Sequence, residues 1–147
     1  MCLPISPYKI EREWICAGLR CAVVQAREQG HRCGYVRLPP GHFDYGKDYG
    51  DIDVDVHGGL TFARMEDCVE GDGRGYWLGF DCHHSNDQGT NPRVPLDYQW
   101  QSELSRRAHD IMNSYSLGGH YWTQAEVEAE AEHLALQLSE HHHETVV

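Results

Sequence analysis

Basic residues are scarce in this chain of 147 residues, because 12 Lys and Arg stand against 23 Asp and Glu and leave a net charge of −11 at pH 7. A surface of this sign repels nucleic-acid phosphates and anionic membranes. We therefore expect no direct nucleic-acid partner and no membrane partner. The chain also lacks an apolar run approaching the ~18 residues of a transmembrane helix.

Several common signals are missing as well. The N-terminus has neither the apolar core nor the cleavage site of a secretory signal peptide, which predicts a cytoplasmic location. In a reducing compartment the six cysteines are expected to be small buried side chains or site residues rather than disulfides. No CxxC pair, Walker loop, GxGxxG, GxSxG or HExxH motif occurs, which argues against structural zinc knuckles and against the common NTPase, dehydrogenase, α/β-hydrolase and zincin classes.

The excess of acidic residues is concentrated in two stretches of the chain. Residues 42–81 contain ten acidic and three basic side chains, and residues 123–147 contain six acidic side chains and no Lys or Arg. Neither stretch is of low complexity, so each is expected to be an ordered surface.

Composition and length predict a single globular domain over residues 1–147, since 40% of the residues are hydrophobic and 10% aromatic. Residues 19–25 and 31–38 read as a β-hairpin, although the first run is also compatible with a helix. Residues 51–57 alternate strictly between Asp or His and Ile or Val, which predicts a half-buried strand with an acidic outer face that continues to residue 63. A buried strand is predicted over residues 75–82, antiparallel to the previous one.

The last third of the chain is predicted to be helical. Apolar spacing indicates a helix over residues 101–115, and a capping box of Thr123 and Glu126 begins a second one, which ends before a flexible tail at 140–147. We expect the glutamates of the last helix to be mostly solvated. The predicted fold class is α+β, with an antiparallel sheet of about four strands and two C-terminal helices packed on it.

The densest polar cluster follows the predicted strand 75–82, at a strand end where binding sites often form. Two imidazoles with two or three carboxylates suit a divalent metal, or a general acid and base in which a carboxylate orients a histidine. Three residues are candidates for catalysis: His57, Asp81 and His84. Four residues are candidates for ligand binding, of which the first two belong to a covering loop: Lys47, Tyr49, Asp55 and Asp87. The candidate ligands of a divalent metal are His57, Asp81, His84 and Asp87. In the competing interpretation Asp81 only caps a turn and a neighbouring histidine satisfies it.

Two other sites receive less support. Cys82 lies beside two histidines, but strand alternation points Cys82 and Asp81 to opposite faces, so Cys82 is expected in the core. The series Asp51, Asp53, Asp55 resembles the start of a calcium-binding loop, but Val56 and Phe62 stand where an EF-hand needs Gly and Glu.

Five short runs together resemble a family of small uncharacterised proteins encoded by bacteriophages and prophages. The runs are GHRCGYV at 30–36, PGH at 40–42, GKDY at 46–49, VDVHGGLT at 54–61 and WLGFDCHH at 77–84. The resemblance covers roughly residues 14–140. The family pattern usually reads Asp-Cys-Ala-His, so the chain departs from it at His83, and His84 is the matching histidine. The resemblance implies a phage accessory protein in the host bacterial cytoplasm that acts in counter-defence.

Two hypotheses of function follow. In the first, a pocket lined by the candidate residues binds a small nucleotide-like ligand and, if it is catalytic, hydrolyses it. In the second, the acidic residues Asp51, Asp53, Asp55 and those from Glu126 to Glu132 imitate nucleic-acid phosphates and occupy a basic cleft on a host defence protein, as an anti-CRISPR inhibitor would. The sequence indicates neither the ligand nor the oligomeric state.

Overall fold

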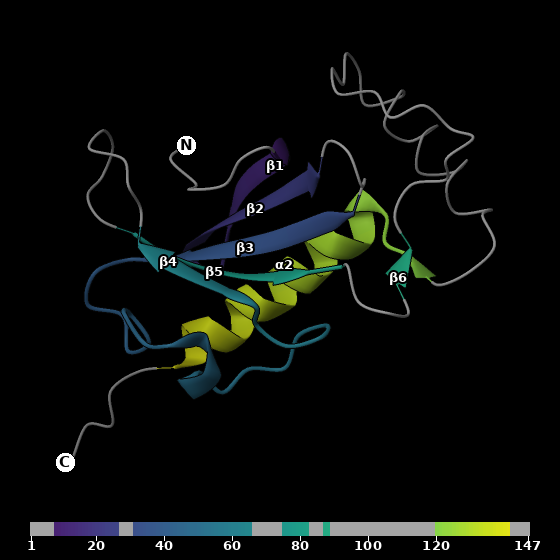
Figure 1. Cartoon of the computed structure of the whole chain (residues 1–147). Helices are drawn as coiled ribbons and strands as arrows, with labels where there is room; N and C mark the ends of the chain where they lie inside the picture. Colours follow the sequence, from purple (N-terminus) through teal and green to yellow (C-terminus); the bar gives the residue numbers. More distant parts are fainter. Residues whose placement is uncertain (1–7, 27–30, 66–74, 83–86, 89–119, 142–147) are drawn as a thin grey trace.

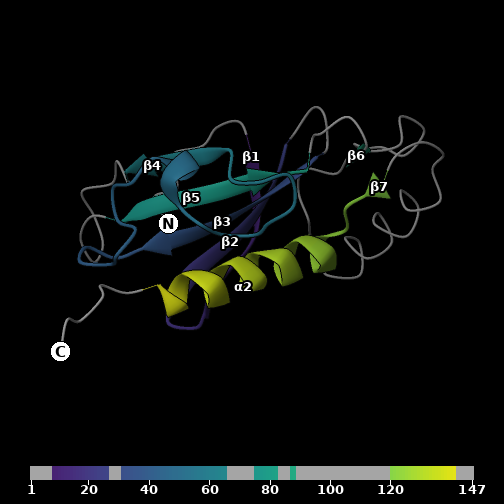
Figure 2. The same ribbon diagram turned by 90° about the horizontal axis from the view of Figure 1, so that it is seen from below.

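The computed structural model describes residues 8–26, 31–65, 75–82, 87–88 and 120–141. Five antiparallel strands form one sheet in the order β1-β2-β3-β5-β4, and the long helix α2 crosses one face of the sheet (Figures 1 and 2). The elements are β1 (Tyr8–Cys16), β2 (Leu19–Ala26), β3 (Arg32–Leu38), β4 (Phe62–Met65), β5 (Tyr76–Asp81) and α2 (Gln124–Glu140). The α+β class is confirmed, with five strands in the sheet instead of about four.

The hairpin of β1 and β2 turns at Ala17 and Gly18, which both have positive φ angles of 53° and 78°. Two such residues make the type of tight turn whose twist matches that of the strands. β1 was not predicted, because a bulge between Ile10 and Arg12 breaks the two-residue period that identifies a strand in sequence.

The bulge residue, Glu11, turns its carboxylate into the interior of the protein, where it meets Arg32 of β3. The two side chains are fully buried and form a two-point ion pair, with Nε to Oε1 at 2.6 Å and Nη2 to Oε2 at 3.0 Å. Arg32 Nη1 also donates to the carbonyl oxygen of Trp122 at 2.9 Å. One guanidinium therefore ties an edge strand and the residue preceding the α2 cap to the middle of the sheet.

The main core lies between α2 and the sheet. Alternate residues of β2, β3 and β5 point to this face, and they pack against five buried residues of α2: Val127, Ala131, Leu134, Ala135 and Leu138. The helix crosses β1, β2 and β3. Ile52 and Val56, from the loop between β3 and β4, complete the same core. Helix and loop together therefore cover one face of the sheet.

The opposite face of the sheet carries a smaller cluster of Ala22, Val24, Cys33, Tyr35 and Trp77. The rings of Tyr35 and Phe62 meet edge to face at 5.2 Å, and Tyr35 lies where a Cβ at Gly79 would stand. Glycine at position 79 of β5 therefore makes room for this aromatic contact.

The α2 prediction is confirmed in detail, since the side chain of Thr123 accepts from the Glu126 N–H and Glu126 caps the Thr123 N–H in return.

Residues 51–57 do not form the predicted strand. A 3-10 turn, η1 (Tyr49–Asp51), is followed by extended chain without a ladder partner, and β4 begins only at Phe62. The predicted helix 101–115 and all but the start of the predicted tail lie outside the described residues. A short parallel pair, β6 (Asp87–Gln88) with β7 (His120–Tyr121), stands apart from the main sheet.

Candidate functional site

Residues 48–55, which comprise η1 and the extended chain after it, contain four exposed carboxylates and are called here the acidic segment. The predicted alternation of faces is correct even though the strand is not: Ile52 and Val56 are buried, and the carboxylates Asp48, Asp51, Asp53 and Asp55 are exposed. Among the described residues, no hydrogen bond or ion pair is formed by any of these four carboxylates.

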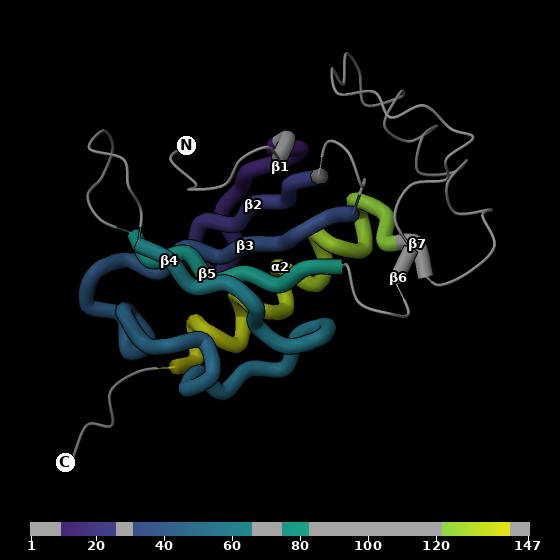
Figure 3. The backbone as a smooth tube through the Cα atoms, in the orientation of Figure 1, coloured from purple at the N-terminus to yellow at the C-terminus, as the bar shows by residue number. Residues whose placement is uncertain are grey.

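The backbone of the acidic segment is attached to α2 rather than to the sheet. The Asp55 N–H donates to Gln137 Oε1 at 2.7 Å, and Gln137 Nε2 donates to the Asp55 carbonyl oxygen at 2.8 Å. Two residues later the His57 N–H donates to Glu130 Oε1 at 3.0 Å. The carboxamide of Gln137 thus makes the pair of bonds that a neighbouring strand would make, and the chain runs beside the helix (Figure 3).

The four glutamates from Glu126 to Glu132 of α2 are not solvated as predicted, because each one has a partner. Glu126 belongs to the capping box, Glu128 pairs with Arg12 of β1, Glu130 holds the His57 N–H, and Glu132 accepts from Trp14 Nε1 at 3.2 Å. Edge strand and loop lie against the helix on either side, so these side chains are partly buried between elements. This half of the predicted acidic surface is therefore used in packing.

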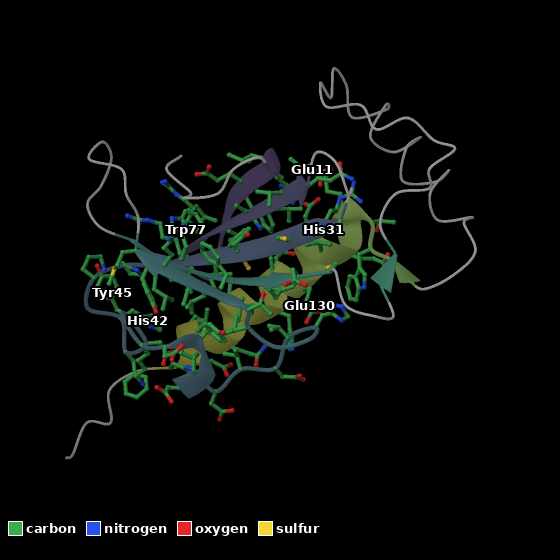
Figure 4. All side chains as sticks on the ribbon, viewed as in Figure 1. Glu11, His31, His42, Tyr45, Trp77 and Glu130 are labelled. Atoms are coloured by element: carbon green, nitrogen blue, oxygen red, sulfur yellow. The ribbon has the colours of Figure 1, made fainter. Side chains whose placement is uncertain are left out.

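The other end of the loop is held by the buried carboxylate of Asp44. Its Oδ2 lies 2.6 Å from His141 Nδ1, at the C-cap of α2, and its Oδ1 lies 3.3 Å from Lys47 Nζ. His42 accepts from the Asp44 N–H through Nδ1 at 3.0 Å, so its Nε2 carries the proton that is donated to the Leu138 carbonyl oxygen at 2.8 Å. Figure 4 shows His42 and Tyr45 in this region. The network joins the loop to the end of the helix.

Lys47 and Tyr49, the two candidate ligand-binding residues of the loop, have different surroundings. The Lys47 ammonium lies 3.5 Å from the centre of the Phe43 ring and also beside Asp44. The backbone carbonyl oxygen of Lys47 accepts from the Tyr76 hydroxyl. Burial, and then the charge of Asp48, raise the pKa of Tyr76. Tyr49 is exposed. Lys47 is therefore part of the loop's own support.

The residues of the predicted pocket are only partly described. The His57 ring packs against Trp122 at 4.4 Å between centroids, on the helix side of the sheet. Asp81 pairs across the strands with Cys33, which points to the opposite face, and accepts from Thr61 Oγ1 at 3.1 Å. The structure thus gives these two side chains different partners. His84 lies outside the described residues, Asp87 is described only as backbone in β6, and the pocket remains a prediction.

The described ranges contain no arrangement typical of a metal centre. Within them, no group of three or more His, Cys, Asp or Glu side chains is placed to hold a metal ion. The metal prediction, which needs His84 and Asp87, is not tested by these residues.

The cysteines of the described chain are free thiols. Burial raises the pKa of Cys21 to about 12, and burial together with the charge of Asp81 raises the pKa of Cys33 to about 12. Cys82 is buried in the main core, as strand alternation predicted. A buried thiol with a raised pKa is a poor nucleophile, so these side chains serve packing.

Sequence reasoning missed the Asp44 network and the Glu11–Arg32 pair. Both join residues that are far apart in the sequence, and neither has a motif. One signal was present for His141, because a basic side chain is favourable at a helix C-terminus.

Comparison of the chain with protein-family models, with curated proteins and with solved structures found no match. Of the helices in the described part, none has the length and apolar character to cross a membrane.

Proposed function

We propose that the protein binds a basic surface on another protein through its acidic segment. The observation that carries this proposal is the set of four exposed carboxylates, none of which is neutralised by a described neighbour. Unpaired carboxylates close together in one exposed segment attract Lys and Arg side chains, speed association and disfavour acidic partners. The resemblance to phage proteins suggests a host defence protein as the partner and inhibition in counter-defence as the result.

The attachment of the segment supports this proposal. Ile52 and Val56 anchor it in the core, and Gln137 fixes Asp55 from the helix. A surface that is already ordered loses little conformational entropy on binding, which favours affinity. The exposed side chains of Phe43 and Tyr49, in the same loop, add the aromatic contacts that often anchor an interface.

The pocket hypothesis receives less support from the described residues. His57 and Asp81 contact different neighbours, and Lys47 is bound to Asp44. The acidic segment is complete within the described chain, whereas the pocket depends on His84 and Asp87. We therefore prefer an interaction protein to an enzyme.

The proposal can be tested in bacteria that carry single defence systems, by counting phage plaques with and without the protein. We expect the wild-type chain to restore plaques against one system, and Asp53→Lys to abolish the effect. Glu140→Lys is the matched control, because it reverses an exposed charge at the end of α2 and changes the net charge equally. If Asp53→Lys stays active while His57→Ala is inactive and folded, the pocket hypothesis replaces this one.

A further inference from the structure

Within the described residues no element pairs with the outer edge of β1, and several of its side chains are exposed. β1 is the end strand of the sheet, so of the described elements only β2 is paired with it (Figure 1). Ile15 is 61% exposed, and Arg12 and Glu13 are exposed beside it. An exposed edge strand with an apolar side chain is a template for pairing with another strand.

The hairpin turn determines which backbone groups face outward. In a two-residue loop the flanking residues, here Cys16 and Leu19, form a hydrogen-bonded pair. Hydrogen-bonded and non-hydrogen-bonded pairs then alternate, so the N–H and C=O groups of Glu13 and Ile15 point away from β2. The edge therefore offers four backbone hydrogen bonds to a partner strand.

We propose that this edge pairs with β1 of a second copy of the chain, antiparallel, with Trp14 on the two-fold axis. This register places Glu13 opposite Ile15 of the other copy and Arg12 opposite its Cys16. It also places the bulge at Glu11 opposite the turn at Ala17. The regular part of β1, residues 12–16, thus pairs along its whole length with the other copy, and the bulge and the turn stay outside the ladder.

Charge complementarity favours a second copy in this register. Trp14, two residues before Cys16 on β1, donates through Nε1 to Glu132 of α2 at 3.2 Å. Arg12 of one copy then faces the strand end that lies next to Glu132 of the other copy, and the contact occurs twice by symmetry. The Arg12 side chain pairs with Glu128 of its own helix, lies over the ring of Trp14 and is still half exposed.

The oligomeric state tests this dimer. We expect light scattering after size exclusion to give a mass that rises toward that of two chains as the protein concentration increases. Ile15→Glu should raise the dissociation constant at least tenfold, because it places two carboxylates directly opposite each other, at position 15 of one copy and Glu13 of the other. Leu136→Glu, the same change of charge at a site of α2 that is 53% exposed, should leave it unchanged. A wild-type chain that is monomeric at every concentration, or equal effects of the two variants, would overturn the proposal.

The register is tested separately with Arg12→Cys. Directly opposite residues of a non-hydrogen-bonded pair have Cα atoms about 4.5 Å apart, within the range of a disulfide. With oxidised glutathione as the oxidant, we expect the thiol introduced by Arg12→Cys to form a disulfide with Cys16 of the other copy and so give a covalent dimer. The double variant Arg12→Cys with Cys16→Ser should form none. Absence of the covalent dimer, or its persistence without Cys16, would contradict the proposed pairing.

Discussion

The carboxylate of Asp44 connects two separate parts of the chain, its own loop and the end of α2. It is 2% exposed and contacts Lys47 of its own loop and His141 at the end of α2. A buried carboxylate that loses its charge leaves its partners without compensation.

Asp44→Asn should therefore lower the free energy of unfolding by about 1–3 kcal/mol, as measured by urea denaturation. Asp53→Asn is the control, because its carboxylate is exposed and has no described partner, and it should change stability by less than about 0.5 kcal/mol. Equal effects of the two substitutions would mean that the Asp44 network does not stabilise the fold.

The buried thiols are expected to make the folded protein less stable at alkaline pH. Cys21 and Cys33 have pKa values of about 12 in the folded chain, against 9.0 for a free thiol. Below pH 9 both states hold the proton and stability is unaffected. Between pH 9 and 12 the unfolded chain releases the proton and the folded chain keeps it, so stability falls as the pH rises.

We expect each thiol to contribute a loss of roughly 1 kcal/mol per pH unit in that window. Urea denaturation with a reducing agent at pH 8 and pH 10 measures it. The double variant Cys21→Ala with Cys33→Ala should lose less stability between the two pH values than the wild type does. The same loss in both proteins would rule out the thiols as its cause.

At the scale of single elements, β3 and β5 each have a glycine over which an aromatic ring of the other strand lies. A Cβ at Gly34 would lie 2.4 Å from the Phe80 ring, which is buried in the main core. The ring cannot move without disturbing that core.

Gly34→Ala is expected to lower the free energy of unfolding by about 1–3 kcal/mol in urea denaturation. Gly50→Ala provides the control, since a Cβ there meets nothing within 4 Å. If Gly34→Ala is as stable as the wild type, the close contact of Phe80 with β3 is not a constraint on the fold.

Local sequence patterns predicted the elements that can be recognised without knowing what they pack against. The capping box predicted the start of α2, and apolar runs predicted β2, β3 and β5. The alternation at 51–57 predicted which side chains are buried, but alternation alone does not specify a hydrogen-bonding partner, and Gln137 took the place of a strand. Likewise, nothing local distinguishes a solvated glutamate from Glu128 or Glu132, which face β1.

The site was less predictable than the fold for the same reason. Asp55 was correctly predicted on an exposed acidic face. Whether His57 and Asp81 lie close together depends on tertiary structure, which the sequence pattern does not contain. Asp44 was not singled out, because its importance comes from His141, 97 positions away in sequence.

At the scale of the whole molecule, the excess negative charge has two different uses. The glutamates of α2 bind the edge strand and the loop to the helix. The carboxylates of residues 48–55 remain exposed, while the buried side chains of Ile52 and Val56 anchor the segment in the core. The net charge of −11 is therefore partly structural and partly available to a partner.

The most direct test of this account is the affinity of the chain for the defence protein that the plaque assay identifies, measured by calorimetry at low and high salt. We expect the wild-type dissociation constant to rise at least ~10-fold from about 50 to 300 mM salt, because exposed charges are screened. Replacing Asp51, Asp53 and Asp55 by Asn should weaken binding at low salt and remove most of the salt dependence. An unchanged affinity in this triple variant would contradict the central claim that the acidic segment is the binding surface.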